Sequence, residues 1–482
     1  MKFGIRDSIP AAYRSVLWSV LRSVLRSGQW SALRPALALG LAAGSGLLWA
    51  KATTEQIAQL DGPQLTCTGA ERAGSASGVA AYGGRWLADW PGMKPAPAFD
   101  AGPYAGEKPL FMITAANRAQ YAAHLTDGEQ ALLQKYPNAF RLPVYPSHRD
   151  FRAPDWACDV AKQNAASASL VHDGLGIAAT AGEIPFPFPA SGLEAIWNVL
   201  AARHVWNETA TLDIADVFAN GNITWGKQRY QTLSPSGDPK QHGSTQETVA
   251  AYFNVMTLAP ARDKGNIGVG FQPNDFKDGS TRVWEYNPGT RRLRQAPDIA
   301  FDYAVPPSGL RTVDDDAMFN GSPERYDWKL LGKREIYVPY NNFRIDDPAL
   351  KYSQLLTPNT LNPDYQRYEL HRVWVIEARL KAGMRHLYAR RVIYADEDSW
   401  AALWADNYDA RGALYRTAFV DYRYAPQAQA WHRGVSVYHD LSSGAYEAGY
   451  LVNEAGEHGW QLNRDDLTPQ MFSPNAALRG GH

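Results

Sequence analysis

Few residues in this chain of 482 have types and spacings that could do chemistry. Three consecutive aspartates, Asp314 to Asp316, offer the oxygen ligands that hard cations take. An acidic run in a loop is usually solvated, however, so we expect no metal there. The stretch YPSHR sets His148 beside Arg149 and could hold an anion. Its alternative interpretation is a structural turn whose side chains bond nearby backbone.

Motifs of common catalytic sites are absent from the sequence. It contains no G-x-S-x-G nucleophile elbow. It also lacks a phosphate-binding loop, a G-x-G-x-x-G turn and an H-E-x-x-H pair. We therefore predict no catalytic residues, no metal and no cofactor, and take the protein for a non-enzyme. A hydrolase is the weakest alternative, because it needs a nucleophile and a base within hydrogen-bond reach in a cleft.

The two cysteines, Cys67 and Cys158, could pair with each other. Exported proteins form disulfides readily. This bridge would close a loop of roughly 90 residues and could contribute ~4 kcal/mol in the chain-entropy model. We predict that it ties an N-terminal arm to the helical region; two free thiols are the alternative. Two cysteines without further ligands do not make a zinc site.

The first fifty residues differ from the rest of the chain. Six basic residues and one acid, Asp7, precede Pro35, and an uncharged run then extends from Pro35 to Ala50. Ala50-Lys51-Ala52 has the small-x-small pattern of a cleavage site. Together these features are typical of a secretory signal peptide, and the apolar run is shorter than the ~20 residues of a spanning helix. We predict a signal peptide at residues 1–52, cleaved near Ala52, and a periplasmic protein; an uncleaved anchor is the alternative.

Loss of this segment changes the charge of the protein. Residues 1–52 hold seven Lys and Arg residues and one acid, so the remaining chain carries 41 basic and 48 acidic residues, a net charge of −7. A general nucleic-acid binder would show a basic patch or stripe. The charge therefore argues against nucleic acid as a partner.

The chain after residue 52 divides into an arm and a domain. Residues 53–107 are rich in Gly, Ala and Pro without periodicity, which predicts an irregular extended arm. Residues 108–482 form the predicted domain, with a helical insert at about 115–207. Helices are indicated at 117–125, at 126–137 and at 191–207, the last two with capping-box spacing. His204 falls on the apolar face of the last helix, and we expect a packed side chain rather than a catalytic one.

From about residue 208 the pattern becomes that of an antiparallel β meander. The clearest hairpin turns at Pro288-Gly289. Its predicted register sets Trp284 opposite Leu293 and Tyr286 opposite Arg291, as favourable cross-strand pairs.

The segment from Tyr368 to Trp400 contains two long extended runs about a turn at 381–383. In the first run the residues Tyr368, Leu370, Trp374, Ile376, Ala378 and Leu380 share one apolar face, which only Arg372 interrupts. Thirteen residues at ~3.3 Å each reach ~43 Å, which suits a large curved sheet better than a compact sandwich. Because the opposite face is also partly apolar, each side needs a cover. The early helices could cover one side and a ligand the other.

Several stretches of the chain together resemble a known family. They are LFMITAANRAQY, YPNAFRLPVYPSHR, GEIPFPFPASGLEAIWN, DDDAMFNGSPERYDWKLLGKREIYVPYNNF, LLTPNTLNPDYQRYELHRVWVIEARLKAGMRHLYARRVIYADEDSW and DNYDARGALYR. The family comprises exported Gram-negative bacterial proteins, is catalogued as a domain of unknown function, and is related to lipoprotein-sorting carriers of the LolA/LolB type. The resemblance covers roughly residues 110–416. It implies a mainly β (α+β) fold, in which a large curved antiparallel sheet forms a half-barrel and helices close the hollow.

The resemblance also implies a function. Relatives suggest a non-catalytic periplasmic carrier or binding protein for lipid-like or other hydrophobic molecules. An RND-type inner-membrane transporter and outer-membrane proteins are the implied partners. An adaptor of such a transport complex is the alternative; it would show exposed apolar patches and no cavity. Our candidates for the hydrophobic wall of the binding site, chosen for size and position on the two hairpins, are Trp284, Tyr286, Trp374, Ile376, Tyr388 and Tyr394. Arg372 could meet an anionic head group, although it could equally pair with an acid across strands.

Overall fold

The computed structural model describes residues 51–94, 98–241, 248–296, 299–456 and 459–480. The predicted signal peptide, apart from its last two residues, lies outside the described residues. Among the residues described, no helix is long and apolar enough to cross a membrane.

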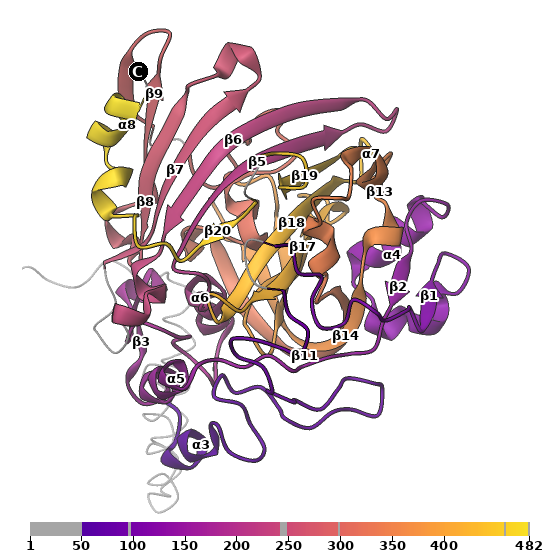
Figure 1. The fold of residues 1–482 in the computed structure, drawn as a ribbon. Coiled ribbons are helices and arrows are strands. Elements are labelled where there is room, and N and C mark those ends of the chain that lie inside the picture. Colours follow the sequence, from indigo (N-terminus) through magenta and orange to yellow (C-terminus); the bar gives the residue numbers. More distant parts are fainter. Residues whose placement is uncertain (1–50, 95–97, 242–247, 297–298, 457–458, 481–482) are drawn as a thin grey trace, which may run out of the picture. The chain divides into compact units, whose positions relative to one another are not determined.

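A 16-stranded sheet dominates the described chain (Figure 1). Its order is β1-β2-β14-β15-β16-β17-β18-β19-β5-β6-β7-β8-β9-β10, with β11 also paired to β14 and β20 to β5. The order does not return to its start, so the sheet is open. Neighbouring strands are antiparallel, except that β14 meets β2 in parallel. The predicted fold class, a large antiparallel sheet with few helices, is confirmed.

The strands of the main sheet have the following bounds: β1 Phe111–Ile113, β2 Leu142–Val144, β5 Asn207–Val217, β6 Ile223–Leu233, β7 Val249–Ala259, β8 Ile267–Pro273, β9 Arg282–Asn287, β10 Arg292–Gln295, β11 Tyr326–Pro339, β14 Tyr368–Leu380, β15 Arg390–Asp396, β16 Ala402–Tyr408, β17 Leu414–Ala425, β18 Ala430–Asp440, β19 Tyr446–Leu451 and β20 Gln461–Leu462. Two small hairpins stand apart from it: β3 Ser169–Val171 with β4 Gly176–Ala178, and β12 Leu356–Thr357 with β13 Thr360–Leu361.

The helices are short. The α-helices are α3 Thr54–Gln59, α4 Asp127–Lys135, α5 Asp155–Ser167, α6 Gly192–Ala201, α7 Tyr352–Leu355 and α8 Pro474–Gly480. The 3₁₀ helices are η2 Arg118–His124, η3 His172–Gly174, η4 Pro235–Gly237, η5 Pro239–Gln241, η6 Ala261–Asp263, η7 Phe276–Asp278, η8 Val313–Met318, η9 Pro323–Arg325, η10 Phe343–Asp346, η11 Pro363–Tyr365 and η12 Pro469–Phe472.

Two of the predicted helices, α4 and α6, begin at their predicted capping residues. The Thr126 hydroxyl accepts the Glu129 N–H and the Glu129 side chain accepts the Thr126 N–H, which starts α4 with a capping box. The Ser191 hydroxyl likewise accepts the Glu194 N–H at the start of α6, but the Glu194 carboxylate accepts the N–H of Ala190. However, α6 ends at Ala201, so His204 lies beyond the helix and not on its face. The predicted helix at 117–125 is the 3₁₀ helix η2, and α5 was not predicted.

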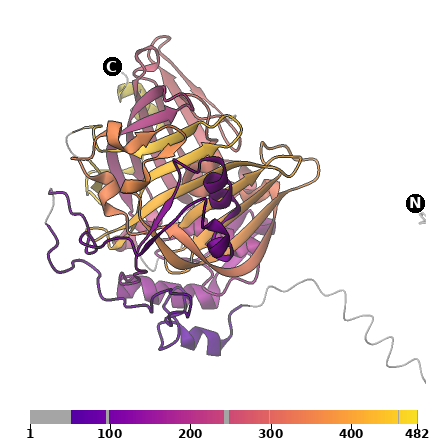
Figure 2. The same cartoon turned by 90° about the vertical axis from the view of Figure 1, so that its right-hand side faces the viewer.

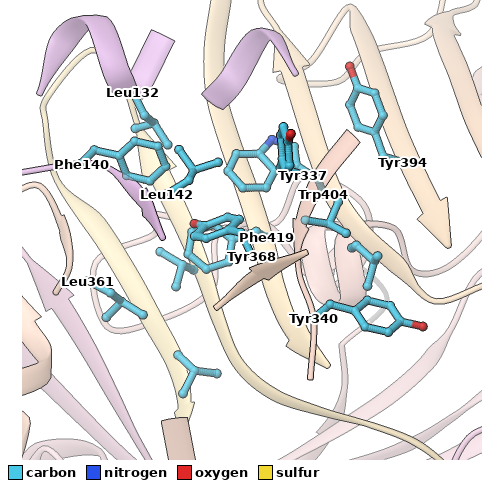
Figure 3. Packing of buried hydrophobic residues seen from close by; sticks show 14 of the residues in the cluster. Leu132, Phe140, Leu142, Tyr337, Tyr340, Leu361, Tyr368, Tyr394, Trp404 and Phe419 are labelled. Carbon is cyan, nitrogen blue, oxygen red and sulfur yellow. The ribbon is translucent and has the colours of Figure 1, made fainter. Parts of the chain in front are cut away.

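Two hydrophobic clusters cover β14 from its two sides. Trp374 and Ile376 pack with α6 residues and with β15 to β17. Val373 and Val375 belong to the other cluster, in which Figure 3 shows Leu132 of α4 and Leu142 of β2. The purple helices, α4 among them, lie over the orange and yellow strands in Figure 2. Protein therefore covers both sides of this strand, and no ligand is needed there. Tyr368 and Leu370 join the cluster of Val373, so the single apolar face predicted for this run is wrong. A strand of this length twists, which turns its two ends toward different layers.

The register predicted for the β9–β10 hairpin is also wrong. Tyr286 pairs with Leu293, and Trp284 pairs with Gln295. The first pair that closes the loop is Asn287 with Arg292, and Arg291 inside the loop has a positive φ of 54°. This longer turn shifts the partner strand by two residues relative to our expectation.

Candidate functional site

A cavity of about 410 Å³ lies inside the domain and is the candidate binding site. Its wall draws on strands β5 to β9 from one part of the sheet and on β16 to β19 from another, with the end of α6 and η8 between them. Ligand cavities in proteins span roughly 300–1,000 Å³. The volume therefore suits one small hydrophobic molecule or part of a larger one.

Most of the side chains that line this cavity are aliphatic or aromatic. The apolar wall includes Val199, Leu200, Val205, Ala251, Phe253, Val255, Val283, Ile299, Val305, Val313, Phe319, Ala402, Tyr422 and Trp431. β7 contributes its residues with every position half-buried, in contrast to β16, in which every residue is buried. A cavity that can bind a ligand is expected to have such a wall, which is apolar and lies on a strand that is not fully packed.

A network of charged side chains forms the polar part of the wall. Arg433 on β18 places Nη1 3.1 and 3.0 Å from the two carboxylate oxygens of Asp316, and Nη2 3.4 Å from Glu208 Oε1. Its guanidinium lies 4.1 Å from the ring centre of Tyr450. The Tyr450 hydroxyl donates to Asp316, and Arg433 also bonds the Tyr230 hydroxyl. Two carboxylates and two tyrosines thus hold the guanidinium of Arg433 in place.

Glu208 on β5 connects this network to a histidine. Its Oε2 lies 2.9 Å from His432 Nε2, and the Thr232 hydroxyl donates to Oε1 over 3.1 Å. Burial alone would raise the pKa of Glu208, but Arg433 and His432 hold it at about 2. Burial lowers the pKa of His432 to about 4, against the effect of Glu208. At neutral pH Glu208 is therefore ionised, and His432 is a neutral donor to it.

Arg311 extends the network to the far side of Asp316. Arg311 Nε donates to Glu447 Oε1 over 2.6 Å, and Nη1 lies 3.7 Å from Asp316 Oδ1. Burial raises the pKa of Glu447 to about 7 although Arg311 opposes this shift. The network is therefore close to balanced in charge, with one carboxyl group that titrates near neutrality.

The three consecutive aspartates are not solvated, contrary to our expectation. Asp314 and Asp315 are buried and lie 3.1 and 3.0 Å from the guanidinium of Arg391, whose side chain is fully buried. Asp316 turns the other way, into the cavity. The helical conformation of η8 is interrupted at Asp316, whose ψ is 134°, and Ala317 and Met318 follow with φ angles of 48° and 70°. Such left-handed conformations are costly for residues other than glycine and often mark functional segments.

His204 and Ser234 also line the cavity, and they bond to each other. His204 Nε2 lies 3.2 Å from Ser234 Oγ, and Nδ1 lies 2.7 Å from the carbonyl oxygen of Ala202. Since a carbonyl only accepts, Nδ1 carries the proton and Nε2 accepts from the serine. This pair resembles a nucleophile and base, but loss of water on the protein side of the ring lowers the pKa of His204, although the residue keeps exposed surface. Its partner on the other nitrogen is a carbonyl instead of the carboxylate that stabilises an imidazolium in catalytic triads.

The residues predicted for the hydrophobic wall lie elsewhere and are not brought together. Trp284 and Tyr286 pack beneath α8, Trp374 stacks on Trp400, and Ile376 is buried against α6 residues. The Tyr388 hydroxyl donates to Asp315, and the Tyr394 hydroxyl to Asp406. None of the six, nor Arg372, is among the residues that line the 410 Å³ cavity.

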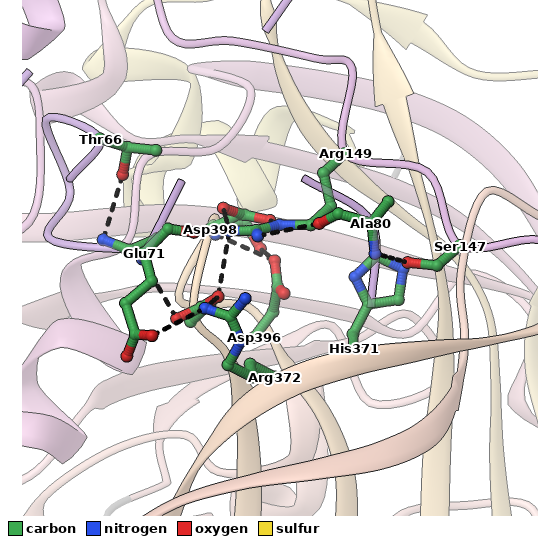
Figure 4. A network of polar contacts seen from close by, with 12 residues as sticks. Thr66, Glu71, Ala80, Ser147, Arg149, His371, Arg372, Asp396 and Asp398 are labelled. Atoms are coloured by element: carbon green, nitrogen blue, oxygen red, sulfur yellow. Dashed lines mark hydrogen bonds and ion pairs between the residues drawn. The ribbon is translucent and has the colours of Figure 1, made fainter. Parts of the chain in front are cut away.

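Arg372 belongs to a polar network under the N-terminal arm (Figure 4). It lies 3.1 Å from both Glu71 and Glu397, and it bonds the carbonyl of Ala73. Arg149 sits beside it and donates to both oxygens of Asp398 over 2.7 and 2.8 Å. Arg372 is thus paired with acids. YPSHR has a structural role, since Arg149 bonds Asp398 and the carbonyls of Ala80 and Glu71, but the stretch is irregular chain and not a turn. The arm is also fastened by the disulfide predicted between Cys67 and Cys158, which is present.

Within the described residues, one group of side chains has the composition of a metal site. Ligand atoms of His371, Asp396 and Asp398 lie within 4.8 Å of one another. Protein groups already occupy most of them: Arg149 binds both oxygens of Asp398, and Tyr340 and Ser399 donate to Asp396 Oδ2. His371 Nε2 lies 3.1 Å from Glu369. The arrangement fits an ion-pair network that anchors the arm, and we assign no metal to it.

Glu208 and Arg433 were missed at the level of sequence, and Asp316 was considered only as part of an acidic run. Glu208, Asp316 and Arg433 come from β5, η8 and β18, and nothing in their local pattern links them. One usable signal existed, since His432-Arg433 lies between Trp431 and the mainly apolar stretch from Gly434 to Tyr438. A charged pair inside such a strand needs buried partners.

Comparisons with known proteins identify relatives over most of the chain. Residues 112–479 match the family described as "Protein of unknown function (DUF1329)". An uncharacterized protein from Pseudomonas aeruginosa is 38% identical over 451 residues, which is 92% of this chain and 96% of the relative. The family resemblance predicted from the sequence is thereby confirmed.

Solved structures with a similar arrangement share little sequence. A Vibrio parahaemolyticus domain described as an outer-membrane lipoprotein-sorting protein has a TM-score of 0.40 at 16% identity, covering 60% of this chain and 98% of its own. A LolA superfamily protein from Nitrosomonas europaea has a TM-score of 0.35 at 12% identity, covering 60% of this chain and 100% of its own.

Proposed function

The chain belongs to the DUF1329 family, and from that premise and the cavity we propose that it is a non-catalytic carrier or binding protein for lipid-like or other hydrophobic molecules. The observation that carries the proposal is the 410 Å³ cavity with its largely apolar wall. Water opposes free diffusion of such molecules, because each exposed CH₂ group costs ~0.8 kcal/mol. A cavity that replaces water with aliphatic and aromatic side chains removes this cost.

We place the protein in the periplasm. The support is the leader pattern of residues 1–52 and the disulfide, which is typical of oxidising compartments. Export is tested by cell fractionation with N-terminal sequencing. A mature terminus near Ala52 in the periplasmic fraction agrees with the proposal, and an intact Met1 in the membrane pellet contradicts it.

The main test of carriage is direct identification of the cargo. Protein purified from its native cells without detergent is extracted with organic solvent, and bound molecules are identified by mass spectrometry. A defined amphiphile at a fixed molar ratio supports the proposal. Absence of any bound amphiphile, together with failure to displace a fluorescent hydrophobic probe, would favour the adaptor of an RND-type complex instead.

A cavity-filling variant localises the binding. Ala251 lines the cavity, so Ala251→Trp fills part of the space and should reduce probe binding at least about tenfold, equivalent to about 1.4 kcal/mol. Ala410 lies exposed in the turn between β16 and β17, and Ala410→Trp is the matched control. Equal loss of binding in both variants, or in neither, places the ligand outside the cavity.

The hydrolase alternative has one specific observation in its favour, the hydrogen bond between His204 and Ser234. The lowered pKa of His204 disfavours the protonated imidazole that a general base must become. We therefore expect no labelling of Ser234 by a fluorophosphonate probe. Labelling that disappears in Ser234→Ala would establish an enzyme.

A further inference from the structure

We propose that the cavity selects amphiphiles whose polar end is uncharged, such as alcohols, glycerides or amides, and rejects both fatty acids and alkylammonium ions. This inference rests on the function proposed above and adds the class of head group. It comes from the way in which the charged side chains of the cavity wall are already occupied by one another.

The cationic side chains of the wall are paired. Arg433 contacts both oxygens of Asp316 and one of Glu208. Arg311 donates to Glu447 over 2.6 Å, and Arg203 donates to Glu183 over 3.2 Å. An anionic head group would have to displace one of these carboxylates. The displaced carboxylate would then remain buried without a partner, which is a large penalty in a site of low polarity.

The anionic side chains are occupied in the same way. Asp316 accepts hydrogen bonds from Arg433 and from the Tyr450 hydroxyl. Glu208 accepts hydrogen bonds from Arg433, His432 and Thr232. Aromatic faces could also attract a cation, but the guanidinium of Arg433 lies over Tyr450 at 4.1 Å and over Tyr230 at 5.5 Å. A cationic head group at this end of the wall would therefore meet the charge of Arg433 before it met Asp316, Glu208 or either of these two rings.

Uncharged polar groups complete the wall. Gln228, Gln272 and Asn320 line the cavity, with amide groups that can both donate and accept. A hydroxyl or amide head group can exchange hydrogen bonds with such groups without disturbing an ion pair. A site of this kind distinguishes ligands by leaving the wrong ones with unmatched charge.

The test compares three ligands with the same dodecyl chain: monododecanoylglycerol, dodecanoic acid and dodecyltrimethylammonium. Each displaces an uncharged fluorescent naphthylamine probe from the full mature protein, at about pH 8, where the acid is ionised. We expect the glyceride to bind at least about tenfold more tightly than either charged ligand. Equal or tighter binding of a charged ligand overturns the inference while leaving the carrier function intact. If neither the probe nor any of the three binds, the carrier function itself fails.

Two variants test the cause. Glu208→Gln and Asp316→Asn each remove one negative partner of Arg433. Each should strengthen the binding of dodecanoic acid about tenfold and so reduce the preference for the glyceride over the acid. Glu285→Gln, which removes the partner of the exposed Arg294 outside the cavity, is the control and should change nothing. Thermal unfolding identifies a variant that fails to fold, and each substitution removes a different partner of Arg433. Unchanged selectivity in a folded Glu208→Gln or Asp316→Asn contradicts the proposed cause.

Discussion

Several charged side chains in this protein are buried, and oppositely charged neighbours offset the free-energy cost of removing them from water. Arg391 has no exposed surface and lies between Asp314 and Asp315, with a further hydrogen bond to the carbonyl of Met318. A buried ion pair contributes little compared with an apolar substitute, but removing one member leaves the other charge without a partner. Stability at such positions is therefore sensitive to single substitutions.

Arg391→Met should lower the free energy of unfolding by about 3–5 kcal/mol, because it removes the guanidinium that lies against two buried aspartates. Arg379→Met removes an arginine whose side chain is 64% exposed and should change stability by less than about 0.5 kcal/mol. Urea denaturation of both variants checks the contrast. Similar effects at the two positions would show that burial does not set the cost.

Asp421 makes stability depend on pH. Burial raises its pKa to about 7, against the hydrogen bond from Asn342. Between the unfolded pKa of about 4 and the folded pKa, the native state binds more protons than the unfolded state, so this residue's contribution falls as pH rises. Asp421→Asn removes the effect. The variant should gain stability relative to the wild type from about pH 4 to pH 7, by up to about 4 kcal/mol. A difference that is constant with pH in parallel urea titrations would refute this assignment.

At the scale of elements, sequence patterns predicted those strand and helix boundaries that depend only on neighbouring residues. The alternation and β-branched content of residues 368–380 predicted β14 with its observed bounds, and the capping residues predicted the start of α4 and α6. The β9–β10 register depended on a loop conformation at Arg291 that the Pro-Gly turn signal did not reveal. The site could not be predicted, because its charges were identifiable only once β5, η8 and β18 had been brought together.

The N-terminal arm is an element whose attachment can be tested. Between α3 and β1, the only β-pairings of the described residues are isolated bridges. The arm is held by Cys67–Cys158, by the ion pairs of Arg149 and Arg372, and by a buried aromatic cluster that includes Trp90 and Tyr104. The cysteines are 91 residues apart, which corresponds to about 4 kcal/mol in the chain-entropy model.

The double variant Cys67→Ser, Cys158→Ser should therefore lose about 4 kcal/mol and be cut faster by protease between residues 60 and 107. The native protein should show the same shift when reduced with dithiothreitol, whereas the double variant should not respond to it. A variant as stable as the native protein would mean that the ion pairs and the aromatic cluster of Trp90 and Tyr104 hold the arm without the disulfide.

At the scale of the whole described domain, stability is unevenly distributed along the sheet. β14 to β17 are buried on both sides by α4, α6 and their clusters, whereas every residue of β7 is half-buried and β10 is largely exposed. Regions with few buried contacts open at lower free energy than the rest. The cavity joins these two parts, since its wall includes both β7 and β16. A carrier needs this combination, because cargo must be held firmly and still be released.

Hydrogen exchange monitored by mass spectrometry tests this division. In the empty protein, peptides from β7 to β10 should exchange faster than peptides from β14 to β16, because their hydrogen bonds are less protected by packing. Addition of monododecanoylglycerol should slow exchange in β6, β7 and β9, whose residues line the cavity, and leave β1 and β2 unchanged. The Ala251→Trp variant, with the cavity partly filled, should show little further slowing on addition of the ligand. Protection confined to β1, β2 or the arm would place the ligand away from the cavity. Uniform exchange along the chain would contradict the idea that β7 to β10 open locally and so release the cargo.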